Sequence, residues 1–239
     1  MSQIKPYNTQ AGKKQEVEDM FDNIAPKYDL LNHVLSMKID VLWRNTLVKW
    51  MNKDAPKEVL DVATGTGDLA IAVQKGTGAQ VTGLDLSQQM LNVGIEKIKK
   101  ISLQDKITMQ KGDAENLPFE SNKFDAVSVA FGVRNFENLE KGLAELSRVV
   151  KENKSVYILE FSKVEGLLGP LYMFYFKNIL PMIGRLVSKD NRAYTYLPDS
   201  VNAFPFGEKM KSILLNTGFK KVEYKKLSFG IATIYKATK

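Results

Sequence analysis

The stretch Glu58–Leu69, reading EVLDVATGTGDL, decides the fold. Its first half is apolar and β-prone, and its second half consists of small residues. This pattern predicts a buried strand that ends in a tight loop and opens a helix. Gly65 and Gly67 have no Cβ and can adopt backbone conformations closed to other residues, so a ligand can approach the main chain there.

The spacing of the loop lies at the edge of the dinucleotide-binding pattern G-x-G-x-x-G, because the third glycine position holds Ala70. Asp61 lies on the strand before the turn, where an acid suits a cationic or amino-acid ligand better than a pyrophosphate. A generic strand–helix loop without a ligand is the alternative interpretation. The rest of the chain must decide between them.

A second predicted strand, Gln80–Leu86 with the sequence QVTGLDL, carries Asp85 near its end. In doubly wound sheets, an acid at the end of the second strand hydrogen-bonds the hydroxyls of a ribose. The glycine loop and this acid together indicate a ligand that contains a nucleoside.

The composition narrows the class of protein. A chain of 239 residues with 44% apolar residues can form one domain over residues 1–239 with a sizeable core. The absence of cysteine excludes disulfides, thiolate metal sites and a thiol nucleophile, and a single histidine excludes a histidine metal cluster, so we expect no metal. Because the N-terminus lacks the apolar core of a signal peptide, we expect a cytoplasmic protein.

The formal charge of +7 is compatible with nucleic acid, an anionic membrane surface or an anionic substrate as a partner. The lysines are spread along the chain, which favours a solvated surface just as well. The chain carries no nucleic-acid-binding motif, so we expect no nucleic acid partner.

The N-terminal segment, about residues 15–55, is predicted to be helical. Apolar residues recur at helical spacing from Val17 to Ile24, and Pro26 should end that helix. Polar and aromatic residues then interleave densely enough to line a pocket, among them Tyr28, Asp29 and His33. A lone histidine is more often a core or surface residue than a catalyst, so His33 is a secondary candidate.

Further strands are expected to end at Asp113–Ala114, near Phe131 and at Glu160, with amphipathic helices between them. The alternation of strands and helices is typical of an α/β fold with a doubly wound, Rossmann-like, mostly parallel sheet. Because parallel strands end at one edge, we expect Asp61, Asp85, Asp113 and the turn with Arg134 and Asn135 to converge on one crevice.

The pattern changes over residues 163–206, which we interpret as a helical insertion. Prolines and basic residues interrupt its apolar run, so it is no membrane-spanning helix. It fits either ordinary core or a lid that contacts a greasy substrate or a membrane. The chain ends in two predicted strands, one of which should lie antiparallel in the sheet.

These residues carry a resemblance to a known family. The glycine loop, the acid after strand two and GDAENLPF after strand three resemble the class I S-adenosylmethionine-dependent methyltransferases. The chain is more closely similar, along nearly its full length, to the menaquinone/ubiquinone biosynthesis C-methyltransferase family. The motifs that carry this resemblance are FDNIAPKYDLLNHVLS, DVATGTGD, GDAENLPF, AFGVRN, LEFS and YTYLPDSVNAFP.

The resemblance implies S-adenosylmethionine as cofactor and assigns roles to residues. Gly65, Thr66 and Gly67 would surround the methionine part, Asp85 the ribose hydroxyls, and Asp113 with Ala114 the adenine. Where the family often has serine before FG, this sequence has Ala130, so a backbone contact would serve at that cofactor position. The family commonly has glycine one residue after the LS of the first motif; here the sequence reads SMKID, so the loop shape should differ.

The implied reaction is methyl transfer to a ring carbon of a polyprenylated hydroquinone, demethylmenaquinol in the first instance. The ring carbon becomes nucleophilic when a neighbouring hydroxyl loses its proton, and orientation and exclusion of water supply much of the rate. We hypothesise that Arg134, with Asn135, lies over the hydroquinone oxygens and stabilises the phenolate. The alternative is that Arg134 pairs with an acid; Tyr28, Asp29 and His33 are weaker candidates for proton transfer.

A polyprenyl tail also implies peripheral contact with the inner face of the cytoplasmic membrane, through the apolar segment from residue 167 to 187. A homodimer is only a mild expectation. Alternatives are a C-methyltransferase for a ubiquinone precursor, a methyltransferase of the same fold for another small molecule or RNA, and a non-enzymatic partner protein. The last should have lost the acidic strand ends, which are all present here.

Overall fold

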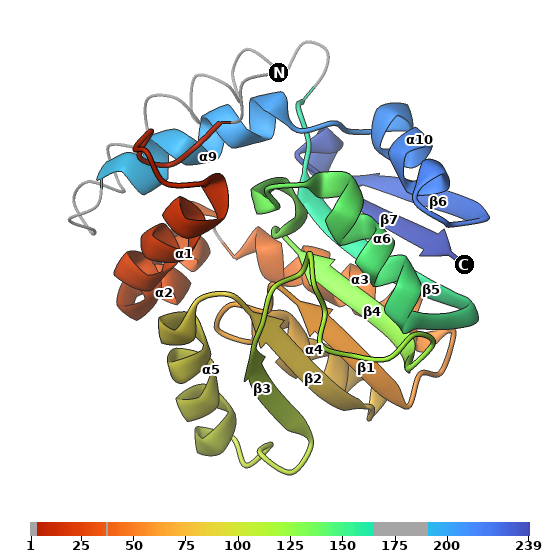
Figure 1. Ribbon diagram of the computed structural model, residues 1–239. Helices are drawn as coiled ribbons and strands as arrows, with labels where there is room; N and C mark the ends of the chain where they lie inside the picture. Colours follow the sequence, from red (N-terminus) through yellow and green to blue (C-terminus); the bar gives the residue numbers. More distant parts are fainter. Residues whose placement is uncertain (1–3, 37, 165–190) are drawn as a thin grey trace.

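The computed structural model describes residues 4–36, 38–164 and 191–239. Within these residues the strands form one seven-stranded sheet in the order β3-β2-β1-β4-β5-β7-β6 (Figure 1). The strands are β1 (Glu58–Val62), β2 (Gln80–Asp85), β3 (Ile107–Lys111), β4 (Phe124–Ala130), β5 (Val150–Phe161), β6 (Lys221–Leu227) and β7 (Ala232–Thr238).

The sheet is parallel from β3 to β5 and antiparallel where β7 enters. β1 pairs in parallel with both β2 and β4, and β4 pairs in parallel with β5. β7 runs antiparallel to β5 on one side and to β6 on the other. Both the doubly wound class and the antiparallel strand near the C-terminus are therefore confirmed.

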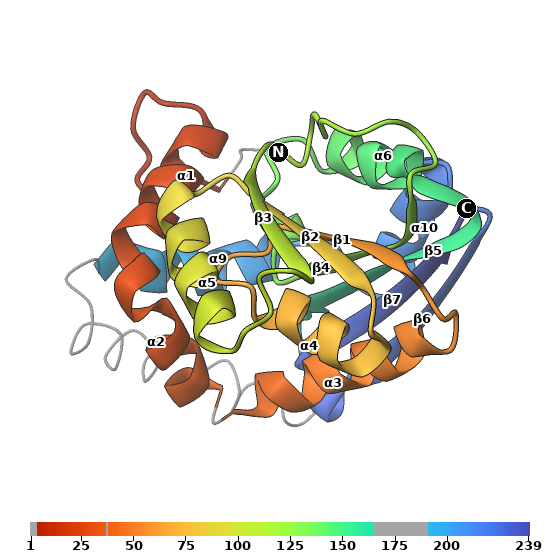
Figure 2. The same cartoon turned by 90° about the horizontal axis from the view of Figure 1, so that it is seen from below.

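Helices cover both faces of the sheet (Figures 1 and 2). On one face, α3 (Ile39–Asn52), α4 (Asp68–Thr77) and α5 (Gln88–Lys100) contribute to a buried cluster that includes Leu47, Val73 and Ile98. On the other, α6 (Leu139–Val149) and α10 (Glu208–Asn216) contribute Leu143, Leu146, Met210 and Leu214. The helices are amphipathic, so the sheet removes their apolar sides from water.

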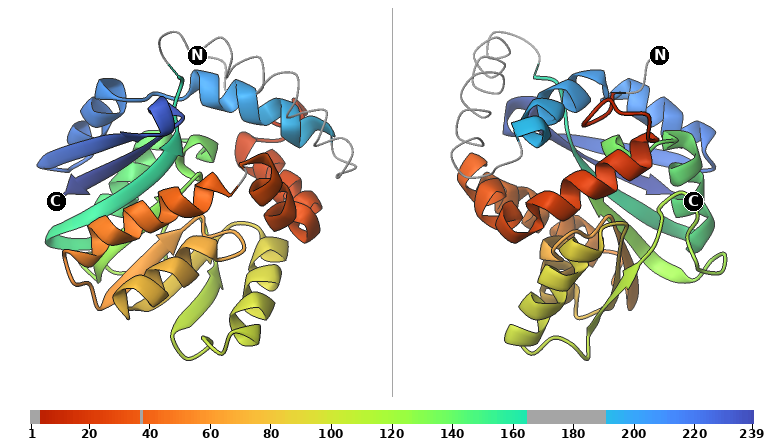
Figure 3. Two further views of the ribbon diagram at one scale, coloured as in Figure 1. Left: turned by 180° about the vertical axis from the view of Figure 1, so that it is seen from behind. Right: turned by 60° about the vertical axis from the view of Figure 1, so that its left-hand side comes forward.

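The helices α1 (Lys13–Ile24), α2 (Tyr28–Leu35) and α9 (Asn191–Ala203) lie beyond the edge where the parallel strands end (Figure 3). The short 3-10 helix η1 (Ala25–Lys27) joins α1 to α2. A third buried cluster joins Val17 and Met20 of α1 to Tyr196 and Val201 of α9. The N-terminal helices thus close over the edge at which the sequence predicts a site.

Several boundaries differ from the sequence expectation. β3 ends at Lys111, and Asp113 forms only an isolated bridge with Asn116, because its side chain accepts the Glu115 N–H and turns the chain. The turn before α3 keeps the left-handed conformation that glycine favours, since Lys38 adopts φ 61°. A lysine therefore holds the shape that a glycine commonly supplies.

The predicted insertion falls mostly outside the described residues, which exclude 165–190. Its described end is helix α9, which contains Pro198. A proline removes one backbone hydrogen bond from a helix, and the packing of Tyr196 and Val201 against α1 offsets this loss. Among the described residues, the structure has no helix long and apolar enough to cross a membrane.

We expect Leu143→Ala to lower the free energy of unfolding by about 2–5 kcal/mol, because it leaves a cavity in the core between α6 and the sheet. Urea unfolding at equilibrium measures this change. Lys141→Ala, two residues earlier on the exposed side of the same helix, is the control and should change the free energy by less than about 0.5 kcal/mol. Equal effects of the two variants would contradict the placement of this core.

Candidate active site

The loop between β1 and α4 takes a shape that few residues tolerate. Ala63, Gly65 and Gly67 all have positive φ, at 52°, 56° and 80°. The Thr64 N–H donates to the carbonyl oxygen of Leu84 at 3.0 Å, which ties the loop to the end of β2. The missing Cβ atom of Gly65 leaves the main chain of this loop open to a ligand there.

Asp85, at the end of β2, holds the loop and faces a pocket. Its carboxylate accepts the Gly65 N–H at 2.7 Å and the Ser87 N–H at 2.9 Å. Desolvation of the carboxyl group raises the pKa of Asp85 to about 6, although the backbone hydrogen bonds act in the opposite direction. A carboxylate has about four acceptor positions, so capacity for further donors is left on the pocket side.

A pocket lies at the carboxyl edge of the sheet. Seven of the residues predicted from the sequence line it: Tyr28, Gly65, Asp85, Asp113, Ala114, Ala130 and Asn135. The expected convergence of strand ends on one crevice therefore holds for these residues.

The N-terminal helix α1 supplies a wall that the sequence argument did not identify. Val17 and Phe21 line the pocket beside Lys14. The ammonium of Lys14 pairs with Asp113 at 2.7 Å, and that of Lys13 donates to the carbonyl oxygens of Arg134 and Phe136. The only signal for this wall in the sequence is the apolar spacing of three and four residues. That spacing predicts a helix but does not show that the helix lines a pocket.

Asp61 does not line the pocket. It is 1% exposed, and its carboxylate accepts hydrogen bonds from the hydroxyls of Thr64 at 2.7 Å and Ser128 at 2.6 Å. Burial raises the pKa of Asp61 to about 6. The residue supports the loop from inside the sheet, and its predicted contact with a ligand stays a prediction.

Arg134 is paired with an acid, which was the alternative interpretation of this residue. Its guanidinium lies 2.8 Å from Glu160 at the end of β5, donates to the carbonyl of Phe131, and stacks over the Phe161 ring at 5.5 Å. Its side chain is 9% exposed, and Nε has no hydrogen-bond partner among the described residues. Its predicted position over a substrate oxygen stays a prediction.

The neighbouring Asn135 lies on the 3-10 helix η2 (Val133–Asn135) and does line the pocket. Its side-chain oxygen accepts a hydrogen bond from the hydroxyl of Tyr196 on α9 at 3.1 Å. Burial raises the pKa of Tyr196 to about 12 and also raises the pKa of Tyr28. Both phenols therefore keep their proton at neutral pH. The predicted part of Tyr28 in proton transfer stays a prediction.

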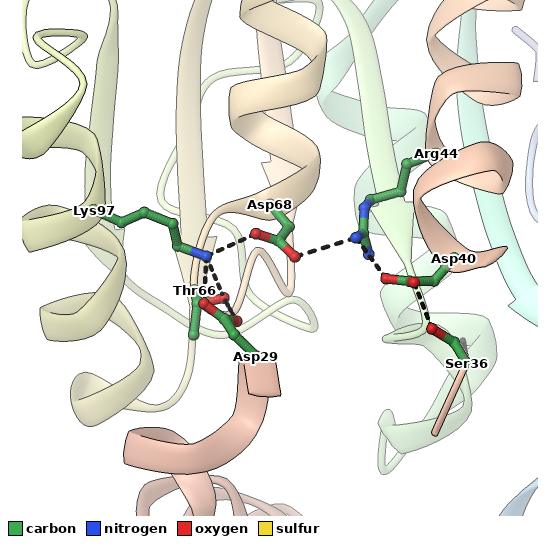
Figure 4. A network of polar contacts seen from close by, with 7 residues as sticks. All are labelled: Asp29, Ser36, Asp40, Arg44, Thr66, Asp68 and Lys97. Carbon is green, nitrogen blue, oxygen red and sulfur yellow. Dashed lines mark hydrogen bonds and ion pairs between the residues drawn. The ribbon is translucent and has the colours of Figure 1, made fainter. Parts of the chain in front are cut away.

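Asp29 does not line the pocket but belongs to a polar network behind the glycine loop (Figure 4). It accepts from the Thr66 hydroxyl at 2.5 Å and pairs with Lys97 of α5 at 2.6 Å. Thr66 and Gly67 likewise lie outside the pocket lining, Thr66 in this network and Gly67 as the left-handed cap of α4. The side chain of His33 lies outside the described residues.

The described part of the chain contains no group of three or more side chains suited to holding a metal ion. The pocket instead offers an open main chain at Gly65, a carboxylate at Asp85 and an apolar wall. These features suit an uncharged or cationic organic ligand with a diol.

Comparison with known proteins agrees with this geometry. The model of the ubiE/COQ5 methyltransferase family matches residues 9–239. A protein of Bacteroides fragilis named demethylmenaquinone methyltransferase is 47% identical over 99% of this chain and 97% of its own length. A protein of Geotalea daltonii named ubiquinone/menaquinone biosynthesis C-methyltransferase is 43% identical over 95% of this chain and 97% of its own length.

Among solved structures, a Thermotoga maritima protein described as an S-adenosylmethionine-dependent methyltransferase, possibly acting on histamine nitrogen, has a TM-score of 0.63. The alignment covers 92% of this chain and 99% of that chain at 17% identity. At this identity the likeness shows the fold alone.

We expect Asp85→Asn to change how stability depends on pH. Because the folded-state pKa of about 6 lies above the ordinary value of 3.8, the folded protein binds this proton more tightly than the unfolded chain. The wild type therefore loses stability as the pH rises from 4 to 6, and a neutral side chain does not. The free energy of unfolding of the variant, minus that of the wild type, should therefore rise by about 2–3 kcal/mol from pH 4 to pH 8.

Urea unfolding at several pH values measures this difference in the free energy of unfolding. The prediction concerns how the difference changes with pH, not its sign at one pH. The exposed Asp105→Asn serves as the control, with a difference from the wild type that stays flat. A flat difference for Asp85→Asn as well would contradict the raised pKa.

Proposed function

Since the chain belongs to the ubiE/COQ5 methyltransferase family, we propose that it methylates a ring carbon of demethylmenaquinol and so forms menaquinol. It is an S-adenosylmethionine-dependent methyltransferase. The observation that carries the choice of substrate is the identity of 47% over 99% of the chain to a relative named for this reaction.

The pocket fits the cofactor by its chemistry. The loop at Gly65 leaves room for the methionine part, Asp85 retains acceptor positions for two ribose hydroxyls, and Asp113 with Ala114 can flank the adenine. Bound there, S-adenosylmethionine supplies an electrophilic methyl group on a sulfonium. The remaining steps concern what the side chains of this protein do to the acceptor.

The acceptor ring must lose a hydroxyl proton to water before its carbon attacks the methyl group. The methylated carbon then loses its hydrogen to water as a proton, which restores the aromatic ring. We assign Asn135 to orient the hydroxyl, because its side chain faces the pocket and Tyr196 fixes it from behind. Arg134 acts through its electric field, without touching the acceptor. Its permanent positive charge, held in place by Glu160, lowers the energy of a phenolate beside Asn135. Phe131 and Phe136 exclude water on the same side.

The polyprenyl tail leads to a second part of the proposal, peripheral contact with the membrane. A formal charge of +7 supports attraction to anionic lipids, and Leu30, Leu42 and Phe229 expose large apolar side chains. The segment from residue 167 to 187, expected to make this contact, lies outside the described residues. Sedimentation with anionic liposomes at low salt tests it, and a protein that stays in the supernatant would contradict it.

A benzoquinol precursor of ubiquinone is the second candidate substrate, because the relative from Geotalea daltonii is named for both quinones. We expect labelled S-adenosylmethionine to methylate added demethylmenaquinol. Methylation of the demethylated ubiquinol precursor at an equal rate would mean that the pocket does not discriminate between the two rings. Transfer to tRNA or to a soluble phenol alone would overturn the quinol assignment.

We expect Asn135→Ala to lower kcat by about 100-fold, because the orienting amide is removed from the reacting hydroxyl. Arg134→Lys keeps the charge but loses the planar fork that meets Glu160, so a smaller loss of about tenfold should follow. Steady-state kinetics with saturating cofactor measures both. Near-normal turnover of Asn135→Ala with unchanged cofactor binding would contradict its role.

A further inference from the structure

The network behind the glycine loop joins five parts of the chain through side chains (Figure 4). Asp29 comes from α2, Thr66 from the loop, Asp68 from the first turn of α4, Lys97 from α5 and Arg44 from α3. The contacts continue from Arg44 to Asp40 at 2.6 Å and from Asp40 to the hydroxyl of Ser36 at 2.5 Å. Lys97 did not figure in the sequence argument.

Lys97 is the centre of this network. Its ammonium lies 2.6 Å from Asp29, 2.7 Å from Asp68 and 3.1 Å from the Thr66 hydroxyl. Three short contacts use the three donors that an ammonium group has. Both carboxylates thus meet at one cation, with no more than about a third of any of these charged side chains exposed.

Thr66 is the point at which the network holds the loop. It lies between the two left-handed glycines, is 1% exposed, and both donates to Asp29 and accepts from Lys97. The helix α5 lies directly against it, because a Cβ added to Gly94 would stand 3.1 Å from the Thr66 main chain. One turn further along α5, Lys97 therefore reaches the Thr66 side chain without strain.

The network also connects the glycine loop to helix α2. Asp29 follows Tyr28, which lines the pocket, and Thr66 follows Gly65, which also lines it. The hydrogen bond between Thr66 and Asp29 therefore ties together two segments that each contribute a residue to the pocket lining. Loss of the shared cation would leave Asp29 without its ion pair to Lys97, beside an Asp68 that keeps its pair with Arg44 at 3.2 Å. Two carboxylates around one loop in a partly buried place repel each other.

We propose that Lys97 is a positioning residue for the cofactor: it neutralises Asp29 and Asp68 so that Thr66 holds the Gly65–Gly67 loop in the shape that receives S-adenosylmethionine. This rests on the proposed placement of the cofactor against Gly65. Lys97 itself does not line the pocket, so it acts through Thr66 and not by contact with the cofactor.

The test measures binding of S-adenosylhomocysteine by calorimetry. Lys97→Met should weaken binding about tenfold, and it should raise KM for S-adenosylmethionine while kcat at saturation changes less than about twofold. The control is Lys99→Met on the same helix, whose side chain is 59% exposed and pairs with Glu96 at 3.1 Å; it should bind as the wild type does. Lys97→Arg should recover part of the loss, because the charge remains.

A second substitution gives a sharper outcome. In the Lys97→Met background, Asp29→Asn removes the repulsion from Asp68, so the double variant should bind more tightly than Lys97→Met alone. Thr66→Val, which keeps the shape and loses the hydroxyl, should weaken binding on its own and serves if Lys97→Met does not fold.

Unchanged binding by Lys97→Met would overturn the proposal, as would a lower melting temperature with an unchanged affinity. So would a double variant that binds more weakly than Lys97→Met. If the wild type itself does not bind S-adenosylhomocysteine, the cofactor placement falls first and the role of Lys97 with it, whereas a failure to methylate quinols leaves this test intact.

Discussion

The hydrogen bond from the Gly65 N–H to Asp85 is the constraint on which the site depends. It joins the loop after β1 to the end of β2, two strands that lie side by side in the sheet. The loop can donate this hydrogen bond only because Ala63, Gly65 and Gly67 take left-handed conformations. Asp61 accepts from the Thr64 hydroxyl and Asp29 from the Thr66 hydroxyl of the same loop, so three carboxylates hold one short stretch of backbone.

The fold was largely predictable from the sequence because strand ends, helix periodicity and glycine positions are local signals. Gly65, Asp85 and Asp113 follow from them, since parallel strands bring their ends to one edge. The wall from α1 and the role of Lys97 were not predictable in this way. Lys97 meets Asp29 across 68 positions of sequence, and nothing in its neighbourhood on α5 distinguishes it from the other lysines there.

Two predictions illustrate the limits of residue type as a guide. Arginine beside a pocket suggested contact with substrate, yet Glu160 at the end of the next strand pairs with it, and asparagine one residue later faces the pocket instead. Asp29 suggested proton transfer, and it belongs to an ionic network behind the loop. In both cases the partners of the side chain depend on tertiary packing, which residue type alone does not reveal. The predicted roles of Arg134 and Asp29 in the reaction stay predictions.

The wall that α1 forms has a consequence for how the chain folds. Lys14 of α1 contacts Asp113, 99 residues further along the chain, and Lys13 contacts the Phe136 carbonyl, 123 residues further along. The apolar side of α1 packs on α9, which lies further along the sequence than either. Contacts so distant in sequence form late, because loop closure must come first. During synthesis on the ribosome, the part of α1 that packs on α9 therefore stays uncovered until α9 has been made.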